Sequence, residues 1–180
     1  SIFGIIVGTG FGGALSYKKE IIEGANQIAG DWGHQPLPYP TKEEIETKIN
    51  CPSMNCGRPL CAEQFMSGIG FKDVFNQKHK TSFTSEEIVK LDLNGDRRAN
   101  SELSLYEDRM ARLLAVMIGI FDPDAIILGG GMSNIDRFYV NIPTLIPKYT
   151  FSNKVKTKVI KNFHGDSSGV RGAAWLWNNV

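Results

Sequence analysis

IFGIIVGTGFGGALSYKKEII, residues 2–22, is the stretch of sequence that decides the fold. Ile2–Val7 is a continuous apolar run rich in β-branched side chains, which predicts a buried strand. Residues 14–17 and 20–22 predict two further short strands, with Lys18-Lys19 as the hairpin between them. Because a chain rarely begins inside its own sheet, we expect an upstream segment in the parent protein.

The rest of the chain alternates between helices and strands. Residues 24–70 are irregular and rich in Gly, Pro and Cys, a length of loop that a metal ion would explain. The following elements are then expected: a helix starting near Ser85 and Glu86, a long amphipathic helix over 103–121, a strand over 125–128, a helix over 135–149 with a break at Pro143, a strand over 156–161, and a helix over 168–177 capped by Ser167 or Ser168. Three strands followed by helix, strand, helix, strand and helix match one half of the ribonuclease-H-like duplication of actin-type sugar kinases.

Composition excludes several classes of protein. The chain has 180 residues, 42% of them hydrophobic, and a net charge of +1, which suits one domain with a full core. No basic run provides an electrostatic footprint for nucleic acid. No apolar stretch reaches the roughly 18 residues of a membrane helix and no signal peptide is visible, so a cytoplasmic protein without membrane attachment is expected.

Three cysteines, an odd number, all fall between Cys51 and Cys61. Disulfide frameworks use even numbers spread along a chain, so this cluster favours metal binding. Cys51, Cys56, Cys61 and His34 form the Cys₃His set of a closed structural zinc site. The alternative is three small buried hydrophobic residues and a histidine with an ordinary hydrogen bond.

The glycines at 8, 10, 12 and 13 allow close approach of backbone amides to an anion, because glycine tolerates positive φ and has no Cβ. A plain glycine-rich hairpin explains them equally well. The loop does not match the dinucleotide-binding fingerprint, since a strand follows it rather than a helix.

Four motifs in order add specificity. They are Gly10-Phe11-Gly12-Gly13-Ala14-Leu15 with Gly24 and Gly30-Asp31-Trp32-Gly33-His34; Trp32-Gly33-His34-Gln35-Pro36-Leu37-Pro38; Leu128-Gly129-Gly130-Gly131-Met132-Ser133-Asn134; and His164-Gly165-Asp166-Ser167-Ser168-Gly169-Val170-Arg171-Gly172-Ala173-Ala174-Trp175. Together they resemble the ROK family of repressors, open reading frames and kinases, over essentially the whole chain and most closely in its bacterial fructokinase and mannokinase branch.

The resemblance implies an α/β fold of the ribonuclease-H-like, actin-like ATPase type, with a mixed sheet flanked by helices. It implies that residues 1–180 are the C-terminal domain of an ATP:hexose phosphotransferase, most simply a fructokinase. The N-terminal phosphate loop and the catalytic Asp would lie upstream, so the chain by itself is expected to be inactive. ATP, Mg²⁺, a hexose and structural Zn²⁺ are the implied ligands, and a homodimer is the implied assembly.

The resemblance also assigns residues. Within a zinc and sugar-contact loop over 31–63, it places the sugar at Asp31, His34 and Glu63, and zinc at His34 and the three cysteines. It places the ATP phosphates at Gly8, Thr9 and Gly10, and the adenosine at Gly129, Gly130 and Gly131. Without the resemblance, Asp31 and Glu63 would be ordinary solvated loop residues, and Gly129–Gly131 a plain turn between a strand and a helix.

The chain departs from the family pattern at three positions. Asp31 stands where the family has Glu, Cys51 lies five residues before Cys56 where the family has two, and Leu60 replaces a glycine. Two alternatives to a kinase remain open. One is the sugar-sensing domain of a ROK transcriptional repressor, and the other is a zinc-stabilised interaction domain that binds no nucleotide.

Overall fold

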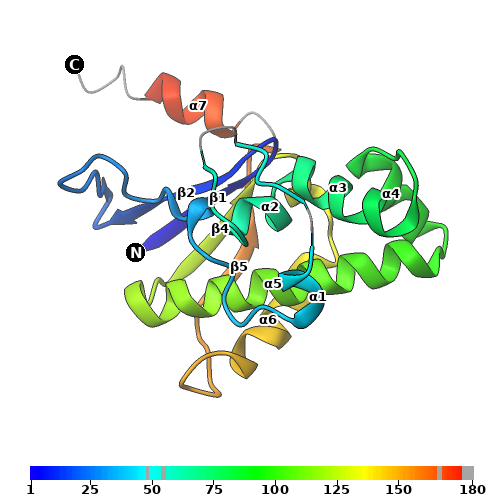
Figure 1. Cartoon of the computed structure of the whole chain (residues 1–180). Helices are drawn as coiled ribbons and strands as arrows, with labels where there is room; N and C mark the ends of the chain where they lie inside the picture. The colour runs from blue at the N-terminus through cyan, green and yellow to red at the C-terminus, as the bar shows by residue number, and fades with distance from the viewer. Residues whose placement is uncertain (48, 54–55, 166–167, 176–180) are drawn as a thin grey trace.

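The computed structural model describes residues 1–47, 49–53, 56–165 and 168–175. Its centre is a five-stranded mixed sheet in the order β3-β2-β1-β4-β5 (Figure 1). The strands are β1 Ile2–Val7, β2 Phe11–Tyr17, β3 Glu20–Ile21, β4 Ala125–Gly129 and β5 Lys158–Lys161. β1, β4 and β5 are parallel, whereas β2 and β3 are antiparallel to their neighbours. This arrangement confirms the predicted ribonuclease-H-like fold class.

Helices and short 3₁₀ turns connect and cover the strands. They are η1 Trp32–His34, α1 Lys42–Ile45, α2 Ala62–Met66, α3 Gly68–His79, α4 Ser85–Leu93, α5 Arg97–Phe121, η2 Gly131–Asn134, α6 Phe138–Leu145, η3 Ile146–Lys148 and α7 Ser168–Trp175. In the described part of the chain, no helix has the length and apolar character needed to span a membrane.

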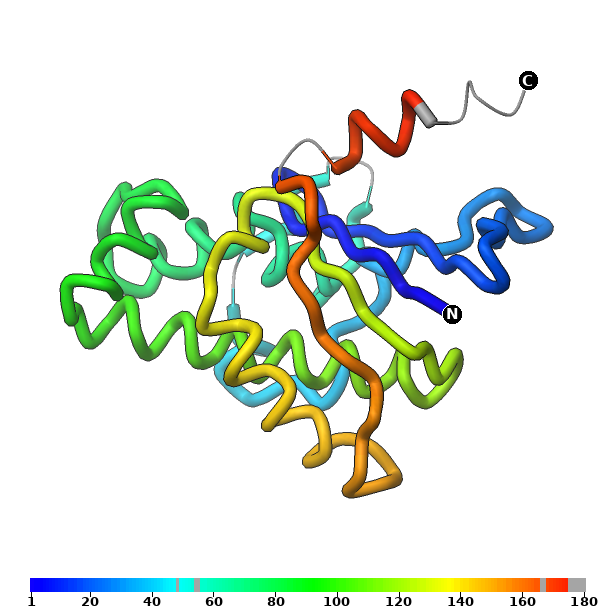
Figure 2. Tube along the Cα trace, turned by 180° about the vertical axis from the view of Figure 1, so that it is seen from behind, coloured from blue at the N-terminus to red at the C-terminus, as the bar shows by residue number. Residues whose placement is uncertain are grey.

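One face of β1 carries the core and the other does not. Phe3, Ile5 and Val7 are almost fully buried, whereas Ile2 and Ile6 are 41% and 47% exposed. The prediction that the whole run is buried is therefore wrong for every second residue, because α5 packs against one side of the sheet only. Figure 2, the view from behind, shows the strands in front of α5.

The long helix α5 is the main support of the sheet. Asp96 caps its N-terminus by accepting from the amides of Arg98 and Ala99, and Asp122 ends it in the left-handed conformation at φ 42°. Its buried face runs from Ala99 to Met117, as the periodicity predicts, but Phe121 in the last turn is 43% exposed. The helix begins six residues earlier than that pattern does, because its first turns carry polar side chains.

Other boundaries agree with the predictions only in part. Lys18 and Lys19 form the predicted hairpin turn, with φ of 51° and 70°. α4 begins at Ser85, as predicted, and Thr84 caps it through a capping box with Glu87. Pro143 lies inside α6, and the regular helix ends only after Leu145.

A cluster of buried charges joins the loop that follows η1 to α5. The carboxylate of Glu44, 3% exposed, accepts hydrogen bonds from the guanidinium groups of Arg109 and Arg112 and from the amide of Thr41. Burial alone would raise the pKa of Glu44, but these hydrogen bonds lower its pKa to about 2. Glu44 therefore stabilises the fold only while it is ionised.

The pH dependence of stability should report this cluster. Because the pKa of Glu44 is lowered on folding, its contribution is complete above an ordinary carboxyl pKa of 4.5 and is lost as pH falls toward 2. We expect Glu44→Gln to remove about 3 kcal/mol of the stability difference between about pH 7 and about pH 2. Urea unfolding of the metal-free chain at both pH values measures it. An unchanged pH slope in the variant would contradict the assignment.

Candidate metal centre and ligand cleft

The four predicted metal ligands converge on one place. His34 lies in η1, Cys61 is the residue preceding α2, and Cys51 and Cys56 lie in the segment between them. The nearest ligand atoms of the four all lie within 4.8 Å of one another, and Cys51 Sγ is 4.0 Å from His34 Nδ1. The wider spacing between Cys51 and Cys56 therefore does not remove Cys51 from the cluster.

The donor set fits a structural zinc ion. Ligand atoms around tetrahedral zinc lie roughly 3.3–3.8 Å apart, given bonds of about 2.0–2.3 Å. The cluster needs only a contraction of about 1 Å to reach that geometry. Cys61 is fully buried and the other three ligands are partly buried, as in a site closed to substrate. The identity of the metal stays a prediction.

The environment of the thiols also favours a cation. Burial raises the pKa values of Cys51 and Cys61, whereas a hydrogen bond from the backbone amide of Arg58 lowers the pKa of Cys56. Three neighbouring thiolates in a partly desolvated site would repel one another. A divalent cation would supply the compensating charge, so metal binding and deprotonation would be coupled.

His34 presents its two ring nitrogens to different partners. Nδ1 faces Cys51, and Nε2 lies 3.9 Å from the carboxylate of Asp31, which is more than half exposed. The geometry is compatible with the predicted double role, in which one nitrogen binds metal and the other binds sugar. Gly33 makes this position of η1 possible, because a Cβ there would overlap the carbonyl oxygen of Phe11.

Glu63 connects the cysteine cluster with the glycine loop. It is 8% exposed, its Oε2 accepts from the amide of Phe11 at 3.1 Å, and its Oε1 lies 3.8 Å from Cys51 Sγ. A solvated loop carboxylate would be exposed and unpaired, so that interpretation does not fit Glu63. Asp31 is exposed, as that interpretation expects, but its carboxylate is paired with His34 Nε2 at 3.9 Å.

A cleft of about 630 Å³ opens beside these residues, and Ile6 of β1 and Ile127 of β4 form part of its lining. Glu63, Gly10 and Gly129 all line it, although they come from three separate segments of the chain. The cleft lies where β1 and β4 end, the edge at which open α/β sheets bind ligands. It therefore brings together one predicted sugar contact and two predicted nucleotide contacts.

The other predicted nucleotide residues are placed differently. The amide of Gly8 donates to the carbonyl of Gly10 at 3.0 Å, so the loop uses that donor internally, and Thr9 is exposed. Gly130 has φ 82°, and a Cβ there would lie 2.6 Å from the carbonyl of Val7, so close packing alone requires this glycine. Gly131, at the start of η2, has open space around it.

Asn162 is a residue of the cleft that the sequence did not reveal. Its amide donates to the carbonyl of Leu128 and to Ser133 Oγ, and its carbonyl accepts from Ser168 Oγ. It joins β4, η2 and the first residue of α7 at the cleft wall. The contact with Leu128 follows from the pairing of β4 with β5, which places Lys161 opposite Leu128, and single-sequence patterns do not reveal that register. The predicted cap Ser167 lies outside the described residues.

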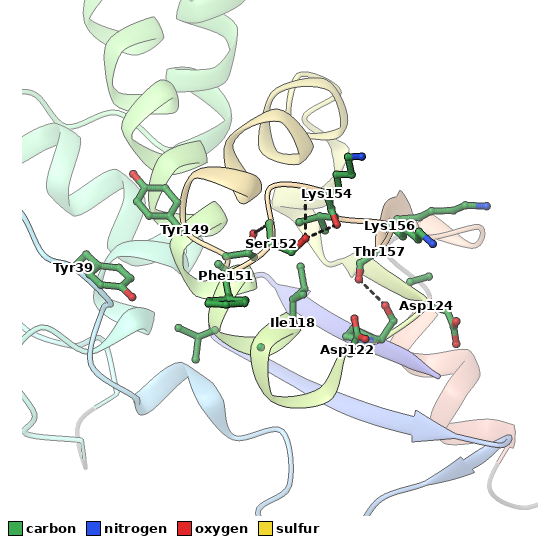
Figure 3. A pocket seen from close by; sticks show the side chains of 18 residues that line it. Tyr39, Ile118, Asp122, Asp124, Tyr149, Phe151, Ser152, Lys154, Lys156 and Thr157 are labelled. Carbon is green, nitrogen blue, oxygen red and sulfur yellow. Dashed lines mark hydrogen bonds between the residues drawn. The ribbon is translucent and has the colours of Figure 1, made fainter.

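A larger cleft, about 950 Å³, lies at the other end of β4, beside Ala125 (Figure 3). Tyr39 and Tyr149 line it with ring centroids 6.1 Å apart, and the hydroxyl of Thr157 donates to the carbonyl of Pro123 at 2.7 Å. None of its described lining residues belongs to the predicted site. Size alone would therefore select the end of the sheet away from the predicted site.

Comparisons with known proteins identify the family of the chain. The family model described as ROK family matches residues 1–180. An N-acetyl-D-glucosamine kinase of Vibrio vulnificus is 37% identical over 180 residues, covering 98% of this chain. The chain spans 58% of the length of that relative.

Two solved structures show the same fold. A ROK family glucokinase from Streptomyces griseus, in complex with glucose and AMPPNP, superposes with a TM-score of 0.82 at 22% identity, covering 97% of this chain and 59% of that one. A ROK family transcriptional regulator, a homologue of the E. coli MLC protein, gives a TM-score of 0.71 at 17% identity, covering 89% and 41%. At these identities the likeness concerns the fold alone.

Proposed function

Because the chain belongs to the ROK family, we propose that residues 1–180 form the C-terminal, sugar- and nucleotide-binding part of an ATP-dependent hexose kinase. The observation that carries the proposal is the position of Glu63. Its carboxylate joins the cysteine and histidine cluster to the glycine loop and lines the cleft that Gly129 also lines. A sugar and a nucleotide bound there would lie side by side.

The proposed roles follow from what phosphoryl transfer requires. Asp31, His34 and Glu63 would hold and orient the sugar hydroxyls, because two carboxylates and an imidazole offer several acceptors in a fixed arrangement. Backbone groups of the loops around Gly10 and Gly129 would lie along ATP and its Mg²⁺. The catalytic Asp is expected in the N-terminal part of the parent protein. Zinc held by His34 and the three cysteines would be structural.

The sugar is the open part of the proposal. Resemblance in the motifs predicts fructose, whereas the Vibrio relative is named for N-acetyl-D-glucosamine. Asp31 is one methylene shorter than the family's Glu, which would move the carboxylate relative to the sugar. Both sugars therefore belong in the first test, together with glucose and mannose. Homodimer formation also stays a prediction.

The test is ATP-dependent phosphorylation by the full-length protein that contains this chain. We expect turnover on one of the four sugars, and a fall of about 10²-fold in kcat/KM for Glu63→Gln, because the hydroxyl that Glu63 orients would be misplaced. Glu20→Gln is the matched control, since Glu20 is exposed on β3. A coupled assay for ADP release measures both variants.

Two results would count against a kinase. Sugar binding without turnover on any of the four sugars would favour the repressor alternative, whose structural relative shares the fold. Absence of both sugar and nucleotide binding would favour a zinc-stabilised interaction domain. A Glu63→Gln variant with unchanged kinetics would leave the kinase proposal standing and remove Glu63 from the sugar site.

A further inference from the structure

Four buried charged side chains meet where α1 contacts α5, away from the cleft. They are Glu44, Glu102, Arg109 and Arg112, each at most 4% exposed, and we call them the charge clamp. Two carboxylates balance two guanidinium groups. Such a cluster is costly to desolvate, so we expect it to have a role besides its contribution to the overall stability of the fold.

Glu44 is the centre of the charge clamp. Its Oε1 accepts from Arg109 Nε and from Arg112 Nη2, both at 2.7 Å. Its Oε2 accepts from Arg112 Nη1 at 3.0 Å and from the amide of Thr41 at 2.9 Å. Arg109 Nη1 in turn donates to Glu102 Oε1 at 2.9 Å. Because each carboxylate oxygen of Glu44 accepts two hydrogen bonds, this network fixes the position of α1 relative to α5.

The charge clamp also holds the chain that leads away from His34. Arg112 Nη1 donates to the carbonyls of Pro38 at 2.9 Å and Tyr39 at 2.8 Å. Pro38 and Tyr39 follow His34 closely, and Glu44 precedes Cys51. The connection between these two zinc ligands is therefore fixed to α5 at two points.

The segment that follows Cys61 also contacts α5. The guanidinium of Arg109 lies over the ring of Phe65, 5.2 Å from its centroid. Phe65 belongs to α2, the helix that begins directly after Cys61. An isolated backbone bridge between Pro36 and Cys61 joins the segment after His34 to the start of α2, beside the cluster. The helix α5 thus contacts segments that carry or adjoin three of the four proposed ligands.

We infer that the charge clamp positions His34, Cys51 and Cys61 for zinc before the metal binds. The inference rests on the zinc part of the proposed function. Ordering a loop of this length costs conformational entropy, and a cluster that orders it in advance leaves less of that cost to the binding step. Preorganisation of this kind raises affinity without adding a ligand.

The test measures zinc affinity of the 180-residue chain by competition with a chromogenic chelator. We expect Glu44→Gln to lower the zinc affinity roughly 10–100-fold. This is the loss of metal affinity found when a residue that orients the metal ligands, rather than a ligand itself, is substituted. Glutamine is isosteric and also completes a capping box with Thr41, so the change removes mainly the charge that holds Arg109 and Arg112.

Glu107→Gln is the matched control. Glu107 is also buried on α5. It accepts hydrogen bonds from Arg137 and from Asn141 of α6, and these residues lie outside the segments that carry the proposed zinc ligands. We expect it to lose stability as Glu44→Gln does, but to keep wild-type zinc affinity. Thermal unfolding of the metal-free proteins measures the stability of each variant.

The outcomes separate cleanly. If Glu44→Gln and Glu107→Gln lose equal zinc affinity, in proportion to their loss of stability, the inference is overturned. The proposal that the wild-type chain binds zinc would still stand. Failure of the wild-type chain to bind zinc would overturn it together with the zinc part of the proposed function, while the hexose assay would still decide the kinase part. If Glu44→Gln does not fold, Arg112→Lys replaces it, and wild-type affinity in that variant would overturn the inference.

Discussion

Cys61→Ser will abolish stoichiometric zinc binding and lower the thermal unfolding temperature of the chain. Cys61 is the fully buried member of the proposed ligand set, and serine oxygen is a poor substitute for thiolate on zinc. The loss of affinity should exceed the roughly 10–100-fold cost of removing a partner outside the ligand shell. Structural zinc contributes apparent binding free energies of about 10–16 kcal/mol in small domains, and that energy stabilises the fold.

Metal analysis and thermal unfolding, each with and without a strong chelator, measure the effect. The wild-type chain should lose its zinc to the chelator and then unfold at the temperature of Cys61→Ser. The variant itself should not respond to chelator, which shows that the substitution acts through the metal and not through packing. A wild-type chain whose unfolding ignores chelator would exclude a structural zinc ion.

Local patterns were sufficient for the sheet and for the cysteine cluster. Ile2–Val7 and Ala125–Gly129 are short, apolar and flanked by glycine, and they pair in parallel with Gly4 opposite Ile127. The three cysteines and His34 were assigned by residue type, because few other functions require three thiols so close in sequence. In both cases the information lies within about ten residues of sequence or in rare residue types.

Contacts between distant residues could not be predicted in this way. Arg112 lies within the apolar face of α5, and its partner Glu44 is 68 residues away in sequence. The position of one residue therefore does not predict the other as its partner. The same holds for Glu63 and the amide of Phe11, which are 52 residues apart. A single sequence shows which side chains are unusual but not which of them meet.

The missed helix α3 illustrates a second limit. It begins at Gly68 and contains Gly70, so its helix propensity is low where it starts. Tertiary packing decides instead, because a Cβ at position 70 would overlap the carbonyl of Gln64 in α2. Ser67 caps the helix by accepting from the amide of Gly70. Glycine is required here for close approach, and close approach is not visible before the fold is known.

Gly33→Ala is expected to disrupt the site and the sheet together. A Cβ at position 33 would overlap the carbonyl oxygen of Phe11, a backbone atom that cannot rotate away. Phe11 also donates its amide to Glu63 and packs its ring 4.8 Å from that of Trp32. The substitution should therefore cost stability at or above the upper end of the roughly 1–3 kcal/mol typical of overpacking. It should also weaken zinc binding, since His34 follows directly.

Gly12→Ala is the matched control, because Gly12 lies beside Phe11 on β2 and a Cβ there would meet no atom within 4 Å. We expect its unfolding free energy to stay within about 0.5 kcal/mol of wild type. Urea unfolding of the zinc-loaded and metal-free forms separates the two effects of Gly33→Ala. A loss in both forms, larger with zinc, is expected because the alanine displaces η1 from β2 and His34 from Cys51. Wild-type stability and zinc affinity in Gly33→Ala would mean that β2 does not hold His34 against the cysteines.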